Sequence, residues 1–393
     1  MKVAIGQAGG PTAVVNRSLA AFISNFNPGE IMLVFNGYSG LAEDDLIVMK
    51  EADKERIISH SHVPGAMLGS GRYHFNEERM ERAVNNLKKH DIDTLVFIGG
   101  NGTMAALYRI SKFAKAKGMD LNVVGIPKTV DNDLCGTDHA PGFASAARYV
   151  AMSVRDSDRD VSSMKNFEQV RILETMGRNA GWLALASGYL KNTAEEGPHH
   201  IYLPERNYCL NDVLINVERT WKEYGYATVV VSEGVKFDED HQVQHSVSNG
   251  RTVLGGISRS LEVFLQENLG VMARGELLGM NQRSFTSAVS RSDCVEAEDV
   301  GIYAAKLVRS GVSGEMVRLL RKDTVEYEVD ISSVSLLDVY NGGERLLTSQ
   351  FIDHPDRYYR WLDGLIGDDL KTYPEPWLRS SKYEEKRKYH NRQ

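Results

Sequence analysis

Residues 94–104, TLVFIGGNGTM, decide the fold class of this chain. The first five residues form a short apolar run, which is typical of a strand covered on both faces. Two glycines end the run abruptly, and a helical pattern covers residues 104–117. The stretch therefore predicts a buried strand, a tight glycine turn and a helix, which together are the repeating unit of parallel α/β sheets.

The same arrangement recurs along the chain. Further apolar runs lie at residues 3–5 before GQAGGPT, 123–126 before PKTVDND, 170–173 before ETMGRNAG, 228–231 before SEG, and 277–278 before GMNQR. Helical patterns also cover residues 13–26, 77–89, 258–268 and 295–309. We find no internal repeat. Alternating strands and helices predict an α/β fold with a parallel sheet, in which ligands bind at the carboxyl ends of the strands.

The composition is that of an ordinary globular protein, with 42% hydrophobic and 25% charged residues. A net charge of −7 disfavours a nucleic-acid partner, because nucleic-acid-binding surfaces are basic. No apolar run approaches the about 18 residues of a membrane span, and the opening MKVAIGQAGG is too short for a signal peptide. Cys135, Cys209 and Cys294 show no paired spacing, so we expect no disulfide framework, no zinc site and a cytoplasmic location.

Two glycine loops are candidate phosphate-binding sites: GGNGTM at residues 99–104 and GGPT at residues 9–12. Glycine lets the backbone approach a phosphate closely, and the start of a helix offers unpaired N–H groups with a positive dipole end. The alternative is a tight strand–helix turn without a ligand. Two such loops after strands of one sheet favour phosphate binding.

The segment PKTVDND at residues 127–133 is the most informative one. Lys128 suits a transferring phosphoryl group, and Thr129 offers a hydroxyl to a substrate. Asp131 and Asp133 suit one general base and one carboxylate that faces a metal ion. The alternative is a turn in which the Asp and Asn side chains only cap backbone groups.

Arginines at separate strand ends are candidates for a phosphate clamp, because the guanidinium fork binds phosphate with two hydrogen bonds. They are Arg72 in GSGR, Arg178 in MGR, Arg274, and Arg283 in NQR. Any one of them could instead be a solvated surface charge. Glu233 in SEG could accept hydrogen bonds from sugar hydroxyls, or could act only as a charge at a helix start.

In this order and at these separations, GGPTAVVN, GSGR, GGNGTM, PKTVDND, ETMGR, SEG and LGMNQR resemble the phosphofructokinases of the ATP- and pyrophosphate-dependent superfamily. The motifs cover roughly residues 1–290. The resemblance implies two Rossmann-like domains with mostly parallel sheets and an active site in the cleft between them, at strand C-terminal ends. It also implies transfer of a phosphoryl group from ATP or pyrophosphate to the 1-hydroxyl of fructose 6-phosphate, with Mg²⁺, in glycolysis.

The resemblance also implies roles for individual residues. Asp131 would be the base for the 1-hydroxyl, with Lys128, Thr129 and Arg178 as further catalytic groups. Asn101 and Asp133 would face the metal. The sugar phosphate would contact Thr129, Asp131, Met176, Gly177, Arg178, Glu233, Arg274, Met280 and Arg283. The phosphoryl donor would contact Gly10, Arg72, Tyr73, Gly100, Asn101, Gly102 and Thr103.

Four residues depart from the family pattern. Asn101 replaces an aspartate that faces magnesium in many members. Gly102 matches ATP users, since pyrophosphate users usually have an aspartate there that blocks a nucleotide's α-phosphate. Lys128 and the GGPT loop match pyrophosphate users, but a lysine attracts any terminal phosphate, so we favour ATP as the donor. Met280 replaces the histidine or tyrosine usually found near the acceptor phosphate.

The expected domains are residues 1–158 for the phosphoryl donor and 159–330 for the sugar phosphate, with part of the latter packing on the first. Residues 331–393 would be a C-terminal extension, exposed and frayed after about residue 350. Family members are usually homodimers or homotetramers in which some arginines reach a neighbouring active site. Here Gln169 stands where one such arginine is expected, and Arg171 lies two residues later.

Three alternatives remain open. GGNGT is also similar to the phosphate loop of NAD kinases and lipid kinases, although those families lack MGR and LGMNQR in this order. The protein could instead be a non-catalytic regulatory paralogue. That interpretation explains the departures at Asn101 and Met280, but a non-catalytic protein has no chemical need for a base at Asp131. Another ketose phosphate, such as sedoheptulose 7-phosphate, could be the acceptor.

Overall fold

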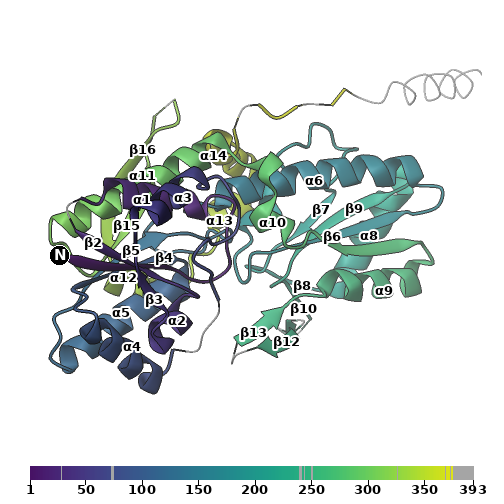
Figure 1. The fold of residues 1–393 in the computed structure, drawn as a ribbon. Helices are drawn as coiled ribbons and strands as arrows, with labels where there is room; N and C mark the ends of the chain where they lie inside the picture. The colour runs from purple at the N-terminus through teal and green to yellow at the C-terminus, as the bar shows by residue number, and fades with distance from the viewer. Residues whose placement is uncertain are drawn as a thin grey trace, which may run out of the picture.

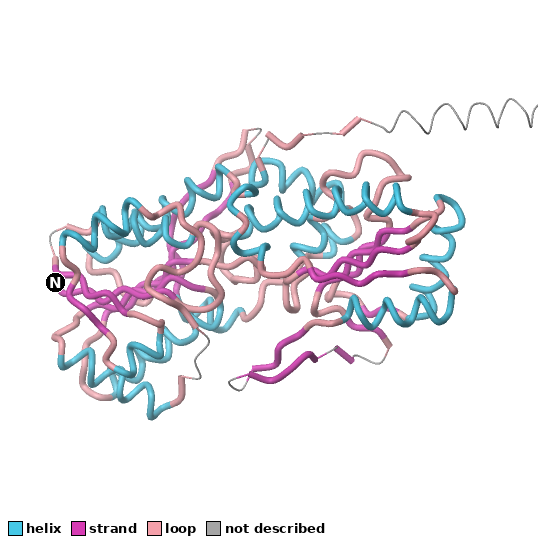
Figure 2. Tube along the Cα trace, turned by 45° about the vertical axis from the view of Figure 1, so that its right-hand side comes forward, coloured by secondary structure: helices cyan, strands magenta, loops and turns pink. Residues whose placement is uncertain are grey.

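A computed structural model describes residues 1–27, 29–71, 75–238, 241–242, 244–248, 251–324, 326–367, 369–371 and 373–374. Two sheets lie one after the other along the molecule, and helices cover both faces of each (Figures 1 and 2). The predicted α/β class with mostly parallel sheets is confirmed. Among the described residues, no helix is both long enough and apolar enough to span a bilayer.

The first sheet has seven strands. Their order is β16 (Val329–Ser335), β15 (Glu315–Arg321), β5 (Asn122–Pro127), β4 (Thr94–Gly99), β1 (Lys2–Gln7), β2 (Glu30–Val34) and β3 (Leu46–Val48). The five inner strands are parallel, and β3 and β16 pair antiparallel at the two edges. Because the inner strands are covered on both faces, every residue of β4 is buried.

Successive residues of these strands enter opposite cores, as strand geometry requires. Val96 and Ile98 join one core, and Leu95 and Phe97 join the other. The first core is covered by α1 (Val15–Asn25), α3 (Glu51–Ser59) and α11 (Arg291–Arg309), and the second by α2 (Tyr38–Glu43), α4 (Glu77–Lys89), α5 (Asn101–Ala116) and α12 (Leu336–Gly342).

Helix α4 shows how the sequence sets these elements. Its apolar residues Met80, Ala83, Val84 and Leu87 recur at helical spacing and are buried. The side chain of Asn76 accepts a 3.0 Å hydrogen bond from the main-chain N–H of Arg79, which caps the first turn.

The second sheet has four strands in the order β14 (Ala273–Leu277), β6 (Val170–Thr175), β9 (Ala227–Ser232) and β7 (His200–Tyr202). All neighbours in it are parallel. Helices α6 (Phe143–Met164), α7 (Trp182–Ala186) and α14 (Pro355–Ile366) cover one face, and α8 (Leu210–Tyr224) and α9 (Ile257–Leu269) cover the other.

Two small sheets contain the remaining short strands, which are β8 (Asn207–Tyr208), β10 (Lys236–Phe237), β11 (His241–Gln242), β12 (Gln244–Ser248) and β13 (Arg251–Leu254). Short helices α10 (Asn281–Ser284), η1 (Thr286–Ala288) and α13 (Ser349–Ile352) complete the chain.

The strands and helices that the sequence patterns predicted are present as β1, β4, β5, β6, β9 and β14 and as α1, α4, α5, α9 and α11. The chain returns to the first sheet with β15 and β16, so that sheet contains two separate pieces of sequence. The domain boundaries at residues 158 and 330 stay predictions.

The prediction of an exposed extension after about residue 350 was wrong for α14. Tyr358, Leu362, Leu365 and Ile366 are fully buried in the core of the second sheet. The many charged residues of this segment occupy the outer face of an amphipathic helix, and its apolar residues face inward.

Candidate active site

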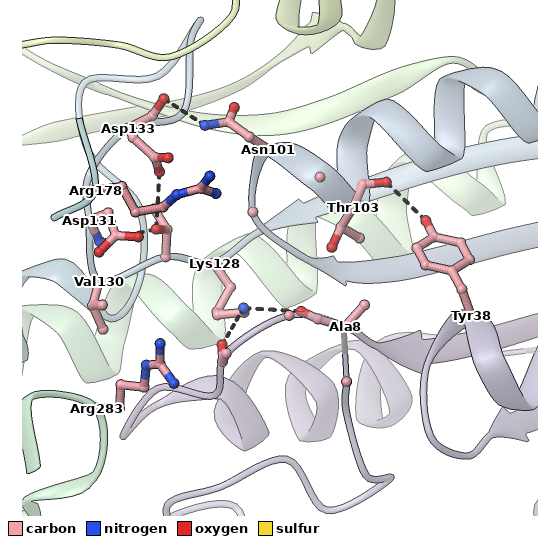
Figure 3. Close-up of a pocket in the computed structure, with 16 residues that line it drawn as sticks. Ala8, Tyr38, Asn101, Thr103, Lys128, Val130, Asp131, Asp133, Arg178 and Arg283 are labelled. Carbon is pink, nitrogen blue, oxygen red and sulfur yellow. Dashed lines mark hydrogen bonds between the residues drawn. The ribbon is translucent and has the colours of Figure 1, made fainter. Parts of the chain in front are cut away.

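The carboxyl ends of strands from both sheets meet at two adjoining cavities, the smaller of which is drawn in Figure 3. Their volumes are about 120 Å³ and about 460 Å³. Asp131, Arg178 and Arg283 line both cavities, so these three side chains mark the place where the cavities meet.

Most of the predicted site residues lie here. Those that line the smaller cavity are Gly10, Gly100, Asn101, Gly102, Thr103, Lys128, Thr129, Asp131, Asp133, Arg178 and Arg283. Those that line the larger cavity are Asp131, Met176, Arg178, Glu233, Met280 and Arg283. Arg72 and Tyr73 lie outside the described residues.

The GGNGTM loop forms the start of α5 and faces the smaller cavity. Gly100 is the N-cap. Its carbonyl accepts hydrogen bonds from the N–H groups of Thr103 (2.9 Å) and Met104 (3.1 Å), so those of Asn101 and Gly102 have no partner within the helix. A side chain on Gly99 would place its Cβ 2.2 Å from the Thr103 hydroxyl, so only glycine allows this tight turn. The loop therefore presents a helix N-terminus to the cavity, which suits a phosphate group.

Lys128 joins the two glycine loops, because its main-chain N–H donates a 3.0 Å hydrogen bond to the carbonyl of Gly99 and its side chain contacts the first loop. Its ammonium group donates hydrogen bonds to the main-chain carbonyls of Ala8 (3.1 Å) and Gly10 (2.5 Å), as Figure 3 shows. Its side chain is almost fully buried, and it lines the smaller cavity. A buried positive charge here holds the first loop in place and attracts an anion into the cavity.

The loop after β5 carries the two aspartates. Thr129 Oγ1 accepts a 3.1 Å hydrogen bond from the main-chain N–H of Asp131 and donates one of 3.2 Å to Asp133 Oδ1. Burial, followed by the charges of Asp133 and Glu233, raises the pKa of Asp131 to about 7. Burial also raises the pKa of Asp133. A carboxylate with its pKa close to neutral is suited to general base catalysis.

Asn101 contacts the same loop. Its side-chain amide donates a 2.9 Å hydrogen bond to the main-chain carbonyl of Asp133 (Figure 3). An ionised aspartate at this position could not make the bond, because it has no proton to donate.

The oxygens at this place fit a Mg²⁺ ion bound together with a substrate phosphate. Mg²⁺ prefers oxygen ligands and often takes only one or two carboxylates from the protein, with substrate phosphates supplying others. Asp133 offers a buried carboxylate, and Asn101 offers its amide oxygen. Within the described ranges, no cluster of three or more acidic, histidine or cysteine side chains could form a metal site without the substrate.

The MGR turn after β6 points Arg178 at the junction of the cavities. Gly177 has a φ of 141°, and Arg178 has a φ of 54°, in the left-handed region. Glu233 Oε1 accepts a 3.0 Å hydrogen bond from the main-chain N–H of Arg178, and Gln282 accepts one of 2.9 Å from that of Met176. The loops after β9 and β14 therefore hold this turn. Gly177 shapes the turn but lines neither cavity.

Arg274 and Arg283 were both expected to contact the sugar phosphate, and only Arg283 lines the cavities. A Cβ on Gly10 would lie 2.9 Å from the guanidinium carbon of Arg283, so that side chain lies against the first loop. Arg274 lies on β14 and lines neither cavity. Its Nε is 3.3 Å from Glu168, and about half of its side chain (52%) is exposed. The contact of Arg274 with the acceptor stays a prediction.

Sequence reasoning missed several residues at the site. Tyr38 lines the smaller cavity and donates a 2.9 Å hydrogen bond to the main-chain carbonyl of Thr103. Glu174 lines the larger one and accepts hydrogen bonds from the main-chain N–H groups of Gly256 (3.0 Å) and Ser258 (2.9 Å). Glu174 is the first residue of the ETMGR motif and directly follows an apolar run. Its position at a strand end could therefore have indicated a site residue.

Comparisons with known proteins agree with this architecture. A family model described as Phosphofructokinase matches residues 2–308. A sulfofructose kinase from Alkalicoccus urumqiensis is 53% identical over 366 residues, which cover 93% of this chain and 96% of that protein. A pyrophosphate–fructose 6-phosphate 1-phosphotransferase from Methylococcus capsulatus is 33% identical over 387 residues, covering 93% of this chain and 92% of that protein.

Solved structures give the same result. The crystal structure of a pyrophosphate-dependent phosphofructokinase from Nitrosospira multiformis superimposes with a TM-score of 0.80 at 30% identity. The superposition covers 95% of this chain and 94% of that one. The chain therefore belongs to the phosphofructokinase family, which makes it a phosphotransferase with an alcohol group as acceptor.

Proposed function

We propose that the protein transfers a phosphoryl group from ATP to the 1-hydroxyl of sulfofructose. In this ketose a sulfonate group stands where fructose 6-phosphate carries its phosphate. The larger cavity would hold the acceptor, and the smaller cavity would hold the phosphates of the donor. Asp131, which lines both, would act as the base between them.

The charged residues of the larger cavity are the main support for sulfofructose as the acceptor. Of the described residues that line it, Asp131, Glu174 and Glu233 bring carboxylates, whereas only Arg178 and Arg283 bring positive charges. A sugar phosphate is close to a dianion at neutral pH, because its second pKa is about 6. A sulfonate carries a single negative charge. Because Met280 adds no further positive charge to this wall, the balance favours the less charged head group.

Met280 and a relative support the same acceptor. The Met280 side chain lines the larger cavity, together with Leu254 and Leu277, and gives no charge or N–H donor to an anion. The family usually has a histidine or tyrosine at that place. The relative named as a sulfofructose kinase is 53% identical over almost the whole of both chains.

Proton transfer would be the task of Asp131. With a pKa of about 7, its carboxylate can take the proton of the 1-hydroxyl while the hydroxyl oxygen attacks the terminal phosphorus of the donor. Arg178 and Arg283, at the junction of the cavities, would stabilise the negative charge on the transferred group. Lys128 and the N-terminus of α5 would hold the donor phosphates. Most of the catalysis would be positioning and charge stabilisation, as is usual in phosphoryl transfer.

Mg²⁺ would complete the donor site. Asp133 and the side-chain oxygen of Asn101 would hold the ion, which supplies positive charge to the donor phosphates.

Gly102 supports ATP as the donor. It lines the smaller cavity in the first turn of α5 and adds no side chain to it. An aspartate there would place a negative charge where a nucleotide's α-phosphate has to pass. Lys128 favours pyrophosphate as the second candidate donor, since a lysine at that place matches pyrophosphate users. Fructose 6-phosphate is the second candidate acceptor, because the motifs that contact the sugar follow the family pattern except at Met280.

The test is a kinase assay with Mg²⁺ in which each donor, ATP or pyrophosphate, is paired with each acceptor, sulfofructose or fructose 6-phosphate. The proposal expects the highest kcat/KM for ATP with sulfofructose. Met280→His should improve the use of fructose 6-phosphate relative to sulfofructose, since an imidazole can donate a hydrogen bond to the phosphate. Turnover of fructose 6-phosphate alone would refute the proposed acceptor, and turnover with pyrophosphate alone would refute the proposed donor.

A further inference from the structure

The segment of residues 342–347, which runs from the last residue of α12 toward α13, lies against both of the loops that carry Asp131 and Arg178. The main-chain N–H of Arg345 donates a 2.7 Å hydrogen bond to the carbonyl of Asp133, and Leu134 pairs antiparallel with Glu344. On its other side, Trp182 Nε1 donates a 3.2 Å hydrogen bond to the carbonyl of Arg345. This segment therefore joins a loop of the first sheet to the start of α7, which covers the second sheet.

The side chain of Glu344 extends these contacts to the MGR turn. Asn179 Nδ2 donates a 2.7 Å hydrogen bond to Glu344 Oε2, and Arg178 Nη2 lies 4.0 Å from Glu344 Oε1. Glu344 itself lines neither cavity, whereas Arg178 lines both. Its side chain reaches the cavities through Arg178 and Asn179, and its charge also contributes to the raised pKa of Asp133.

Two carboxylates thus hold Arg178. Glu233 accepts a hydrogen bond from its main-chain N–H, which fixes the backbone of the turn in its left-handed conformation. Glu344 faces the guanidinium group, which stands at the end of a long side chain with several rotatable bonds. Because a misplacement of about 1 Å can cost about a hundredfold in rate, the position of this guanidinium matters for the transfer.

A purely structural role would not need the Glu344 side chain. The hydrogen bonds that join segment 342–347 to Asp133 and Trp182 use main-chain atoms of Arg345. Arg345 also stacks on Trp182, with its guanidinium carbon 4.2 Å from the ring centroid. Variants of Glu344 keep all of these contacts, so they separate the position of Arg178 from the folding of the segment.

We propose that Glu344 is a positioning residue for phosphoryl transfer. Through its hydrogen bond with Asn179 and its charge opposite Arg178, it holds the Arg178 guanidinium where the donor and acceptor cavities meet. The inference rests on the proposed function only in that its kinetic test measures phosphoryl transfer.

The kinetic test uses the donor and acceptor pair that the wild-type protein turns over fastest. Glu344→Gln keeps an oxygen for Asn179 but loses the charge opposite Arg178, and Glu344→Ala loses both. We expect kcat to fall about tenfold in the first and about a hundredfold in the second, with the acceptor KM within about threefold of wild type. The double variant Glu344→Ala with Asn179→Ala should be no slower than Glu344→Ala alone, because Asn179 acts through its hydrogen bond with Glu344, which is already lost. Glu326→Gln, an exposed glutamate of the same C-terminal region, should match wild type.

A kcat for Glu344→Ala within twofold of wild type would overturn the proposal. So would a rise in KM at unchanged kcat, or fully additive losses in the double variant. A second arm, crystal structures of wild type and Glu344→Ala, needs no turnover: the Arg178 guanidinium should leave its place between the cavities. An unmoved guanidinium would refute the inference. If wild type turns over none of the four pairs, the proposed function fails by itself, and the crystal structures still decide the role of Glu344.

Discussion

The side-chain amide of Asn101 donates a 2.9 Å hydrogen bond to the main-chain carbonyl of Asp133. The same carbonyl accepts a 2.7 Å hydrogen bond from the main-chain N–H of Arg345. Asn101 and Arg345 are 244 residues apart in the sequence, and together they fix the loop that carries Asp131 and Asp133. The asparagine that departs from the family pattern thus has a structural task that an ionised aspartate cannot perform.

Asn101→Asp should therefore lower both stability and activity. The new carboxylate would face the Asp133 carbonyl without a proton between them, at a cost of about 1 to 3 kcal/mol in the free energy of unfolding. We expect kcat to fall as the loop shifts. Urea unfolding and steady-state kinetics would measure the two effects, with Asn101→Ala as the control that removes the hydrogen bond without adding charge. A faster and equally stable Asn101→Asp variant would show that metal binding outweighs this hydrogen bond.

The pKa of Asp131 predicts the pH dependence of the reaction. Because the base must be ionised, kcat/KM should fall about tenfold per pH unit below a midpoint near the pKa of about 7. Sulfofructose suits this measurement, since a sulfonate does not titrate in this range. Glu233→Gln removes a negative charge that raises the pKa of Asp131, so its acidic limb should move to lower pH. A midpoint that stays in place would exclude Glu233 as a cause of the shift, and full activity of Asp131→Asn would exclude Asp131 as the base.

Gly102→Asp tests the donor. An aspartate in the first turn of α5 is compatible with the helix dipole, so the variant should fold. Its carboxylate would enter the smaller cavity and repel the α-phosphate of ATP. We expect kcat/KM for ATP to fall at least about a hundredfold, with a much smaller change in Gly102→Ala, which adds no charge. Unchanged use of ATP by Gly102→Asp would mean that Gly102 does not select the donor.

Two half-buried histidines predict acid sensitivity of the fold. Burial, with a smaller contribution from Lys191 in each case, lowers the pKa values of His199 and His200 to about 4. His199 Nδ1 accepts a 3.0 Å hydrogen bond from the Thr228 N–H, which requires an unprotonated nitrogen. Between pH 6.5 and about 4 the unfolded chain binds more protons than the folded one. The free energy of unfolding should therefore fall by up to about 1.4 kcal/mol per pH unit for each histidine as the pH drops through this window.

Thermal unfolding at several pH values checks this expectation. His200→Gln can still donate to Thr220 Oγ1, which lies 2.8 Å from His200 Nε2, but it does not titrate. Its Tm should fall less than that of wild type between pH 7 and pH 5. The exposed His60→Gln should behave as wild type. Equal losses of Tm in all three proteins would mean that His200 does not titrate in this window.

The sequence predicted the parts of the site that depend on local pattern. An apolar run that ends in glycine or polar residues marks both a buried strand and the loop at its carboxyl end, so β4 and the GGNGTM loop were found together. Because parallel strands end at one edge of a sheet, the loops with Asp131 and Thr103 could be expected at one cavity.

Contacts between distant segments could not be predicted in this way. Glu344 and Asn179 are 165 residues apart, and no local pattern indicates that they touch. Arg274 follows the family motif, but it is the second residue of β14 and lies near the amino end of that strand, where its side chain contacts Glu168. In α14 a signal was present, since Tyr358, Leu362 and Leu365 recur at helical spacing, but the high charge of the segment obscured it.

The comparison of kcat/KM for sulfofructose and fructose 6-phosphate, with ATP and Mg²⁺, tests the central claim most directly. The charge of the larger cavity and the apolar Met280 predict a preference for sulfofructose of at least about tenfold, which corresponds to about 1.4 kcal/mol. A preference of the same size for fructose 6-phosphate would contradict the account, because the cavity would then compensate a dianion with only Arg178 and Arg283 on its described wall.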